Sequence, residues 1–175
     1  MVHINIEFKA KCPNPNLIRE IMKSKDAKFK GKDHQIDTYF NVSSGRLKLR
    51  EGNIETSLIY YERLDQEGPK QSDVLLHHPD PSNTQTLKEI LQKTLGIMTM
   101  VDKEREIYFI DNVKFHIDSV QELGSFIEVE AIDQDGSIGV QKLQQQCDYY
   151  LDLFNISNDN LVAESYSDLI IKLKS

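Results

Sequence analysis

The sequence predicts an α+β fold that is mainly β: an antiparallel barrel or strongly curved sheet with helices packed on its outside. Three observations support this prediction. About eight segments alternate or carry strand-type residues, short turns join most of them, and four segments carry apolar residues at helical spacing. The 175 residues fit one domain, residues 1–175, which is large enough to bury a core without disulfides.

The strand pattern is clearest at the N-terminus, where residues 4–10 alternate strictly between apolar and polar side chains. Turn residues such as Ser43-Ser44-Gly45 separate the later segments. We expect eight strands, in this order: 4–10, 35–42, 46–50, 56–64, 72–77, 101–110, 113–122 and 125–132.

The helical pattern places an apolar stripe on one face of each of four segments, which are 14–25, 83–96, 138–154 and 165–173. In the third segment, for example, Leu143, Cys147, Tyr150 and Phe154 recur at helical spacing. Packing on the outside of a barrel would bury these stripes.

Composition and charge exclude several classes of function. The net charge of −7 has the wrong sign for non-specific binding of nucleic acid or anionic lipid, so we expect neither a nucleic-acid nor a membrane partner. No apolar stretch approaches the roughly 18 residues that span a bilayer, and residues 1–5 do not resemble a signal peptide. Two cysteines are too few for a disulfide framework, which favours a cytoplasmic location.

The polar face of the third predicted strand carries three cations in a row, Arg46, Lys48 and Arg50. The common interpretation of such alternation is a solvated outer face. However, adjacent like charges repel unless an anion lies between them, and these three span roughly 13 Å, the length of an extended triphosphate. If helices pack on the aliphatic face of each strand, the charged face lines the barrel interior.

Carboxylates occur at comparable positions of other strands, at Glu7, Asp118, Glu128 and Glu130. Such oxygens are the ligands that Mg²⁺ or Mn²⁺ prefers. A row of cations with a group of carboxylates is the chemistry of a metal–polyphosphate site. His116 shares a strand face with Asp118 and could contact phosphate or metal, or could be a hydrogen-bonded lining residue.

A set of segments in a fixed order carries a resemblance to a known family: residues 5–9, 35–40, 45–50, 60–63, 103–105, 116–118, 123–130 and 165–169. Together they resemble the CYTH superfamily of triphosphate tunnel metalloenzymes, which includes the class IV adenylyl cyclases and the thiamine triphosphatases. The match covers nearly the whole chain and is closest to the class IV adenylyl cyclase-like branch. It implies a single CYTH-type domain forming an eight-stranded, closed antiparallel barrel.

The family's N-terminal Glu-x-Glu-x-Lys strand supplies metal-binding carboxylates and a phosphate-binding lysine. Glu7 and Lys9 match its second Glu and its Lys, whereas Asn5 replaces its first Glu. An amide oxygen ligates a metal more weakly or bonds a metal-held water, so the affinity for metal and the number of metals stay open.

The resemblance assigns roles to the other site residues. Its phosphate-binding cations correspond to Lys9, Arg46, Lys48, Arg50, Arg63, Lys103 and Arg105. Its metal ligands correspond to Glu7, Asp118, Glu128 and Glu130. The catalytic set is then Glu7, Lys9, Glu128 and Glu130.

The resemblance implies an enzyme that uses Mg²⁺ or Mn²⁺ and takes a nucleoside triphosphate or inorganic polyphosphate as substrate. The first expectation is an adenylyl cyclase-type lyase that converts ATP to cyclic AMP and pyrophosphate. The alternative is hydrolysis of tripolyphosphate, thiamine triphosphate or a nucleoside triphosphate, because the N-terminal His-Phe pair of demonstrated cyclases is missing: His3 is not followed by Phe. A non-catalytic polyphosphate or nucleotide binder is a third hypothesis, and both a monomer and a homodimer stay open.

Overall fold

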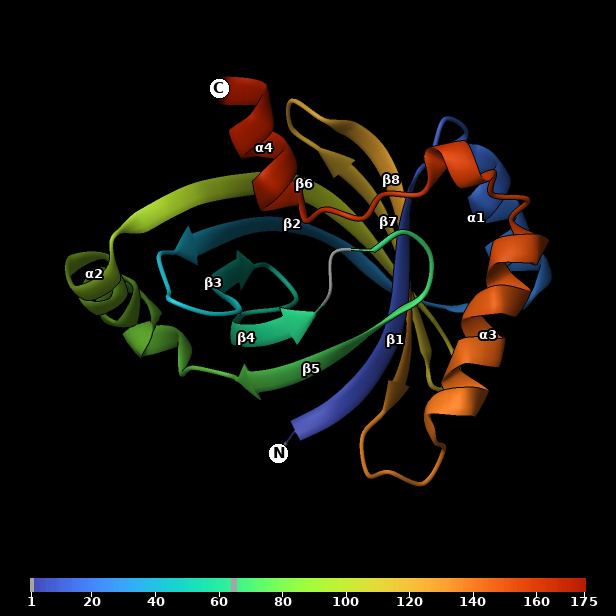
Figure 1. The fold of residues 1–175 in the computed structure, drawn as a ribbon, viewed down its shortest axis with the longest axis horizontal. Helices are drawn as coiled ribbons and strands as arrows, with labels where there is room; N and C mark the ends of the chain where they lie inside the picture. Colours follow the sequence, from blue (N-terminus) through green and yellow to red (C-terminus); the bar gives the residue numbers. More distant parts are fainter. Residues whose placement is uncertain (1, 64–65) are drawn as a thin grey trace.

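The computed structural model of the chain describes residues 2–63 and 66–175, apart from the side chains of residues 2, 3 and 63. Eight strands close into an antiparallel barrel in the order β1-β5-β4-β3-β2-β6-β7-β8 (Figure 1). Their bounds are β1 Val2–Lys11, β2 Lys28–Phe40, β3 Arg46–Gly52, β4 Ser57–Arg63, β5 Lys70–His77, β6 Ile97–Ile110, β7 Val113–Val120 and β8 Gly124–Asp133. The predicted eight-stranded closed barrel is confirmed.

Two strands begin well before their patterns predicted. β2 begins at Lys28 rather than at residue 35, and β6 begins at Ile97 rather than at residue 101. The first half of β2 is polar and contains a register shift next to Gly31, so it carries no alternating signal. Pairing with β6 along its whole length holds this segment in the sheet. Leu64, the predicted end of the fourth strand, lies outside the described residues.

All four predicted helices are present, as α1 Pro15–Ser24, α2 Thr84–Leu95, α3 Val140–Leu153 and α4 Tyr166–Lys174. Single 3₁₀ turns cover Pro81–Asn83 and Asn158–Asn160. Asn14 caps α1, and Ser165 with Asp168 forms a capping box at the start of α4. Among the described residues, no helix combines the length and apolar character needed to span a bilayer.

The largest core lies between the outside of the barrel and two helices. α1 and α3 lie along the wall formed by β1, β7 and β8 (Figure 1). Ile6, Phe8 and Phe115 point outward into this core, where Phe115 meets Tyr150 of α3 edge-on at 4.7 Å between ring centroids. Because side chains alternate along a strand, the charged neighbours of Ile6 and Phe8 point into the barrel. The interpretation of these charged faces as solvated outer surfaces is therefore wrong.

The C-terminal segment closes one end of the barrel. Val162 donates its backbone N–H to the carbonyl of Lys9, and Leu161 forms an isolated bridge with Ala10. Beyond this contact, Tyr166 and Ile170 of α4 pack against an apolar cluster that includes Phe126 of β8. The start of α4 is thereby held at the interior of the barrel, next to the charged strand faces.

Candidate functional site

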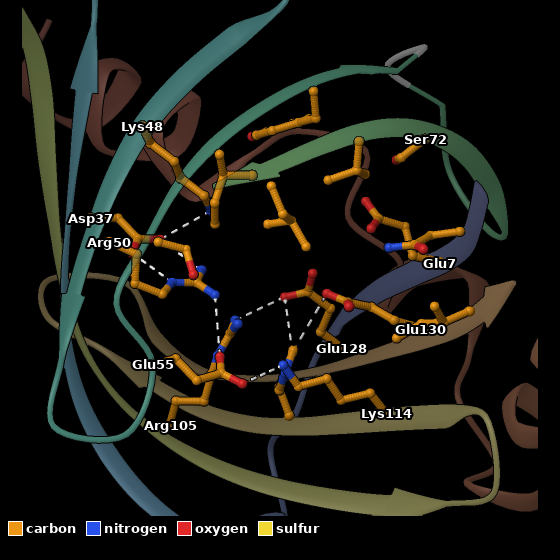
Figure 2. Close-up of a pocket in the computed structure, with 18 of the residues that line it drawn as sticks. Glu7, Asp37, Lys48, Arg50, Glu55, Ser72, Arg105, Lys114, Glu128 and Glu130 are labelled. Atoms are coloured by element: carbon orange, nitrogen blue, oxygen red, sulfur yellow. Dashed lines mark hydrogen bonds and ion pairs between the residues drawn. The ribbon is translucent and has the colours of Figure 1, made fainter. Parts of the chain in front are cut away.

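A cavity of about 420 Å³ occupies the barrel and is lined by residues of all eight strands. Figure 2 shows that Asp37, Lys48 and Arg50 lie on one side of it, and that Glu7, Glu128 and Glu130 lie on the other. Among the described residues, seven basic side chains face the cavity: Lys9, Lys30, Lys48, Arg50, Lys103, Arg105 and Lys114. Five carboxylates of the described residues face it as well: Glu7, Asp37, Glu55, Glu128 and Glu130.

Asp37 of β2 organises three of these cations. Its carboxylate accepts hydrogen bonds from Arg50 Nε at 2.8 Å, Arg50 Nη2 at 2.9 Å, Lys48 Nζ at 3.0 Å and Lys103 Nζ at 2.7 Å. Burial alone would raise the pKa of Asp37, but the three cations outweigh burial and hold the pKa well below its usual range. A charged Asp37 therefore fixes the positions of three side chains that would otherwise repel one another.

Arg105 of β6 is held by two carboxylates. Its Nε and Nη2 donate to the two oxygens of Asp118 at 2.7 and 2.6 Å, and Nη2 also donates to Glu128 at 3.0 Å. Tyr166 donates its hydroxyl to Asp118 at 2.8 Å. Asp118 is not among the residues that line the cavity, and it orients Arg105 from behind. Its predicted role as a metal ligand stays a prediction.

The carboxylates of β1 and β8 lie in register, with Glu7 opposite Glu130 and Lys9 opposite Glu128. Burial and the neighbouring charge of Glu128 raise the pKa of Glu130 to about 8. Burial acts in the same direction on Glu128, but Arg105, His116 and Lys9 together outweigh it and hold the pKa of Glu128 well below its usual range. This wall of the cavity therefore carries crowded negative charge that a cation would relieve.

The residues on this wall fit a divalent cation. One oxygen from each of Glu128 and Glu130 and one ring nitrogen of His116 lie within 4.8 Å of one another. Asn5 Oδ1 and Ser72 Oγ face the same cavity, are buried, and have no hydrogen-bond partner among the described residues. Hard carboxylate and amide oxygens are the ligands that Mg²⁺ and Mn²⁺ prefer.

Comparison with known proteins identifies the family. A family model described as the CYTH domain matches residues 3–163. The chain belongs to the CYTH family. The resemblance noted in the sequence is confirmed. Proteins of this family act on triphosphates and use divalent metals.

Individual relatives agree with this assignment. A protein of Methanocaldococcus jannaschii, described as a putative adenylate cyclase, is 27% identical over 176 residues, which are 95% of this chain and 98% of that protein. A structure from Pyrococcus horikoshii shares the fold with a TM-score of 0.73 at 22% identity, covering 94% and 98% of the two chains. A Hippeastrum structure, described as a putative adenylyl cyclase with a dominant triphosphatase activity, has a TM-score of 0.63 at 12% identity, covering 98% and 95%.

Most of the cations predicted to bind phosphate line the cavity inside the barrel, called the CYTH cavity below, but Arg46 does not. It lies at the end of the barrel closed by α4, where its Nη2 donates to Asp168 at 2.8 Å, and it lines a separate hollow near Gly45. Lys9 lines the cavity and donates its Nζ to the carbonyl of Glu164 at 3.0 Å, above the ring of Tyr166. The side chain of Arg63 lies outside the described residues.

Among the described residues that line the cavity, sequence reasoning missed four charged groups: Lys30, Asp37, Glu55 and Lys114. Asp37 and Lys114 occupy inward positions of β2 and β7, so strand alternation could have found both. Glu55 belongs to the connection between β3 and β4, and it reaches the cavity to accept from Lys114 at 2.6 Å. Only the folded arrangement reveals that contact, because no period applies to a loop residue.

One part of the wall is apolar. Ile59 and Tyr61 of β4 and Val74 of β5 form a small buried cluster that faces the CYTH cavity. These three side chains carry no charge themselves, and Lys48 Nζ lies over the Tyr61 ring, 5.6 Å from its centroid. The cavity can therefore contact an apolar or aromatic group together with a chain of phosphates.

Proposed function

We propose that this CYTH protein is a divalent-metal-dependent enzyme that cleaves a triphosphate inside its barrel. Its reaction is of the adenylyl cyclase type and converts ATP to cyclic AMP and pyrophosphate. The observation that carries the proposal is the convergence of cations and carboxylates from separate strands on one enclosed cavity. Such an arrangement binds phosphate oxygens and a metal ion at the same time.

The cations hold the phosphate chain. Arg50, Lys48 and Lys103 are fixed in advance by Asp37, and Arg105 is fixed by Asp118. Because their positions are set before substrate arrives, little free energy is lost in ordering them as charge develops on the reacting phosphate. Arg50, Lys103 and Arg105 are buried, which strengthens each of these interactions.

The carboxylates of Glu128 and Glu130, with Glu7 beside them, would hold the metal. A metal ion there would supply positive charge to offset the charge that develops on the transferring phosphoryl group. In the cyclase reaction, the ribose 3′-oxygen bonds to the α-phosphorus, the bond from that phosphorus to the β-phosphate oxygen breaks, and pyrophosphate leaves. The 3′-hydroxyl loses its proton in the same conversion.

The apolar wall supports an organic triphosphate rather than an inorganic one. Ile59, Tyr61 and Val74 offer a surface on which a nucleobase can pack, as bases do on aromatic and aliphatic side chains. The description of the Methanocaldococcus jannaschii relative as a putative adenylate cyclase supports ATP as the nucleotide.

Hydrolysis of a triphosphate is the second candidate. It is favoured by the Hippeastrum neighbour, which is described as having a dominant triphosphatase activity, and by the missing N-terminal His-Phe pair, since His3 is not followed by Phe. In this reaction water bonds to the terminal phosphorus, and phosphate and the diphosphate are released. One scaffold supports both outcomes, since the nucleophile and the orientation of the substrate differ.

The experiment is an activity panel. The protein is incubated with ATP or tripolyphosphate and with Mg²⁺ or Mn²⁺, and cyclic AMP, pyrophosphate and phosphate are measured. Cyclic AMP with pyrophosphate supports the cyclase, and phosphate alone supports the triphosphatase. Binding without any product would refute the proposed enzymatic function and leave a non-catalytic binder.

Two variants test the role of the cavity. Glu128→Ala removes a carboxylate of the metal wall and should abolish turnover while leaving the barrel folded. Glu104→Ala is the matched control, because Glu104 lies on the same barrel but points outward, with 45% of its side chain exposed. Its activity should equal that of the wild type. A Glu128→Ala protein with the wild-type rate would contradict the metal site.

A further inference from the structure

We infer that His116 supplies a nitrogen ligand to the cation held by Glu128 and Glu130, and that the site therefore favours first-row transition cations such as Mn²⁺ and Co²⁺ over Mg²⁺. This inference rests on the metal-dependent site proposed above and concerns which cation that site selects.

The side chain of His116 is buried, and the hydrogen-bonding capacity of its two ring nitrogens is unsatisfied. It is 1% exposed, and neither Nδ1 nor Nε2 has a hydrogen-bond partner among the described residues. Leaving a buried polar group without a partner is destabilising, so nearly all such groups in proteins are satisfied by some partner. The two unsatisfied ring nitrogens therefore point to a ligand that binds where the ring is aimed.

The ring is aimed at the two carboxylates. His116 Nδ1 lies 3.9 Å from Glu128 Oε2 and 3.7 Å from Glu130 Oε1, which is too far for hydrogen bonds. Two ligands of one cation lie about 3 Å apart when they are at right angles and about 4.2 Å apart when they are opposite. The three atoms thus already have nearly the spacing of a shared cation, and small side-chain rotations would complete it.

Strand pairing fixes this arrangement. β7 and β8 place His116 directly opposite Glu128, and Lys114 directly opposite Glu130. Lys114 does not compete for the cation position, because its Nζ donates to Glu55 at 2.6 Å. The imidazole and the two carboxylates are therefore presented together by a rigid part of the barrel.

A nitrogen ligand changes the selectivity of a carboxylate site. Mg²⁺ binds oxygen almost exclusively, whereas imidazole suits the first-row transition metals, whose affinities for mixed nitrogen and oxygen sites rise from Mn²⁺ through Co²⁺. Loss of the nitrogen should lower the affinity for Co²⁺ at least tenfold and change the affinity for Mg²⁺ by less than about threefold.

The test uses Mn²⁺ and Co²⁺ as probes. Metal-free protein is loaded with Mn²⁺, with and without tripolyphosphate, and pulsed electron paramagnetic resonance records coupling to ¹⁴N of a directly bound imidazole. Calorimetric titrations then give the affinities for Co²⁺ and Mg²⁺. Wild type should show the nitrogen coupling; His116→Gln should lack it and lose at least tenfold in Co²⁺ affinity.

His34→Gln is the matched control, since His34 lies on the outside of the barrel beside Asp102 and should keep both signals. Thermal unfolding without metal verifies that His116→Gln is folded. Bound Mn²⁺ that Glu128→Ala removes but that shows no nitrogen coupling would overturn this inference and leave the proposed function intact. Failure of any cation to bind, even with tripolyphosphate, would overturn both.

Discussion

Asp37→Asn is the substitution whose consequences can be worked out most fully from the structure. The carboxylate forms four hydrogen bonds of 2.7–3.0 Å to Lys48, Arg50 and Lys103, and the residue is 1% exposed. At an effective dielectric constant of about 20, each such contact between unit charges is worth roughly 6 kcal/mol before desolvation. Desolvation offsets much of this, and removing one partner of a buried ion pair costs about 3–5 kcal/mol in measured cases.

In a chain of this size, 1 kcal/mol shifts the unfolding temperature by about 2–4 °C, so Asp37→Asn should lower the melting temperature by about 6–20 °C. Circular dichroism of the metal-free protein measures this shift. Asp102→Asn is the control, because Asp102 is a carboxylate on the outside of β6 that pairs with the exposed His34. Its stability should change by less than about 1 kcal/mol.

Tripolyphosphate should restore the thermal stability of the Asp37→Asn variant. Without Asp37, three cations lack their shared anion, so a phosphate chain binds more tightly to Asp37→Asn than to the wild type. Ligand at a thousand times its dissociation constant stabilises the folded state by about 4 kcal/mol, which is comparable with the loss. Two results would refute this reasoning. One is that Asp37→Asn has the same melting temperature as the wild type, and the other is that tripolyphosphate raises the melting temperature of the variant no more than that of the wild type.

The remaining predictions concern pH and the end of the barrel. Burial lowers the pKa of Lys103 to about 7, with Asp37 opposing and Arg50, Arg105 and Lys48 assisting. A bound phosphate chain raises that pKa again, so binding takes up a proton. Metal-free affinity for tripolyphosphate should therefore fall by up to about tenfold per pH unit between pH 7 and 9 in fluorescence titrations, and Lys103→Arg should flatten that slope. Arg46→Ala removes the ion pair to Asp168 outside the cavity, so tripolyphosphate affinity should change less than threefold, whereas a tenfold loss would place Arg46 in the phosphate site.

The fold could be predicted because the sequence is locally consistent. Strict alternation gives β1 one apolar face and one charged face, and α1 and α3 each carry an apolar stripe. The helices must therefore pack on the outside of the barrel, against the apolar face, and the charges must point inward. The early part of β2 could not be predicted, because it has no apolar alternation and is held by pairing with β6.

The site residues were predictable where side chains alternate along a strand and the family resemblance supplies their roles, as at Lys48, Arg50 and Glu128. The alternation does not predict how far along the barrel axis a residue lies. Arg46 shares a strand face with Lys48 and Arg50, yet it lies at the end closed by α4, which only the tertiary packing determines. Asp118 likewise shares a face with His116, but two neighbours occupy its oxygens.

The most direct test of the central claim is to locate a metal and a phosphate chain in the barrel. A crystal of the protein with Mn²⁺ and tripolyphosphate, measured at a wavelength where manganese scatters anomalously, gives both positions. The account predicts a manganese peak bound by Glu128 and Glu130, with the phosphates in contact with Arg50, Lys103 and Arg105. Manganese and phosphate found only on the outer surface, with the cavity unfilled, would contradict it.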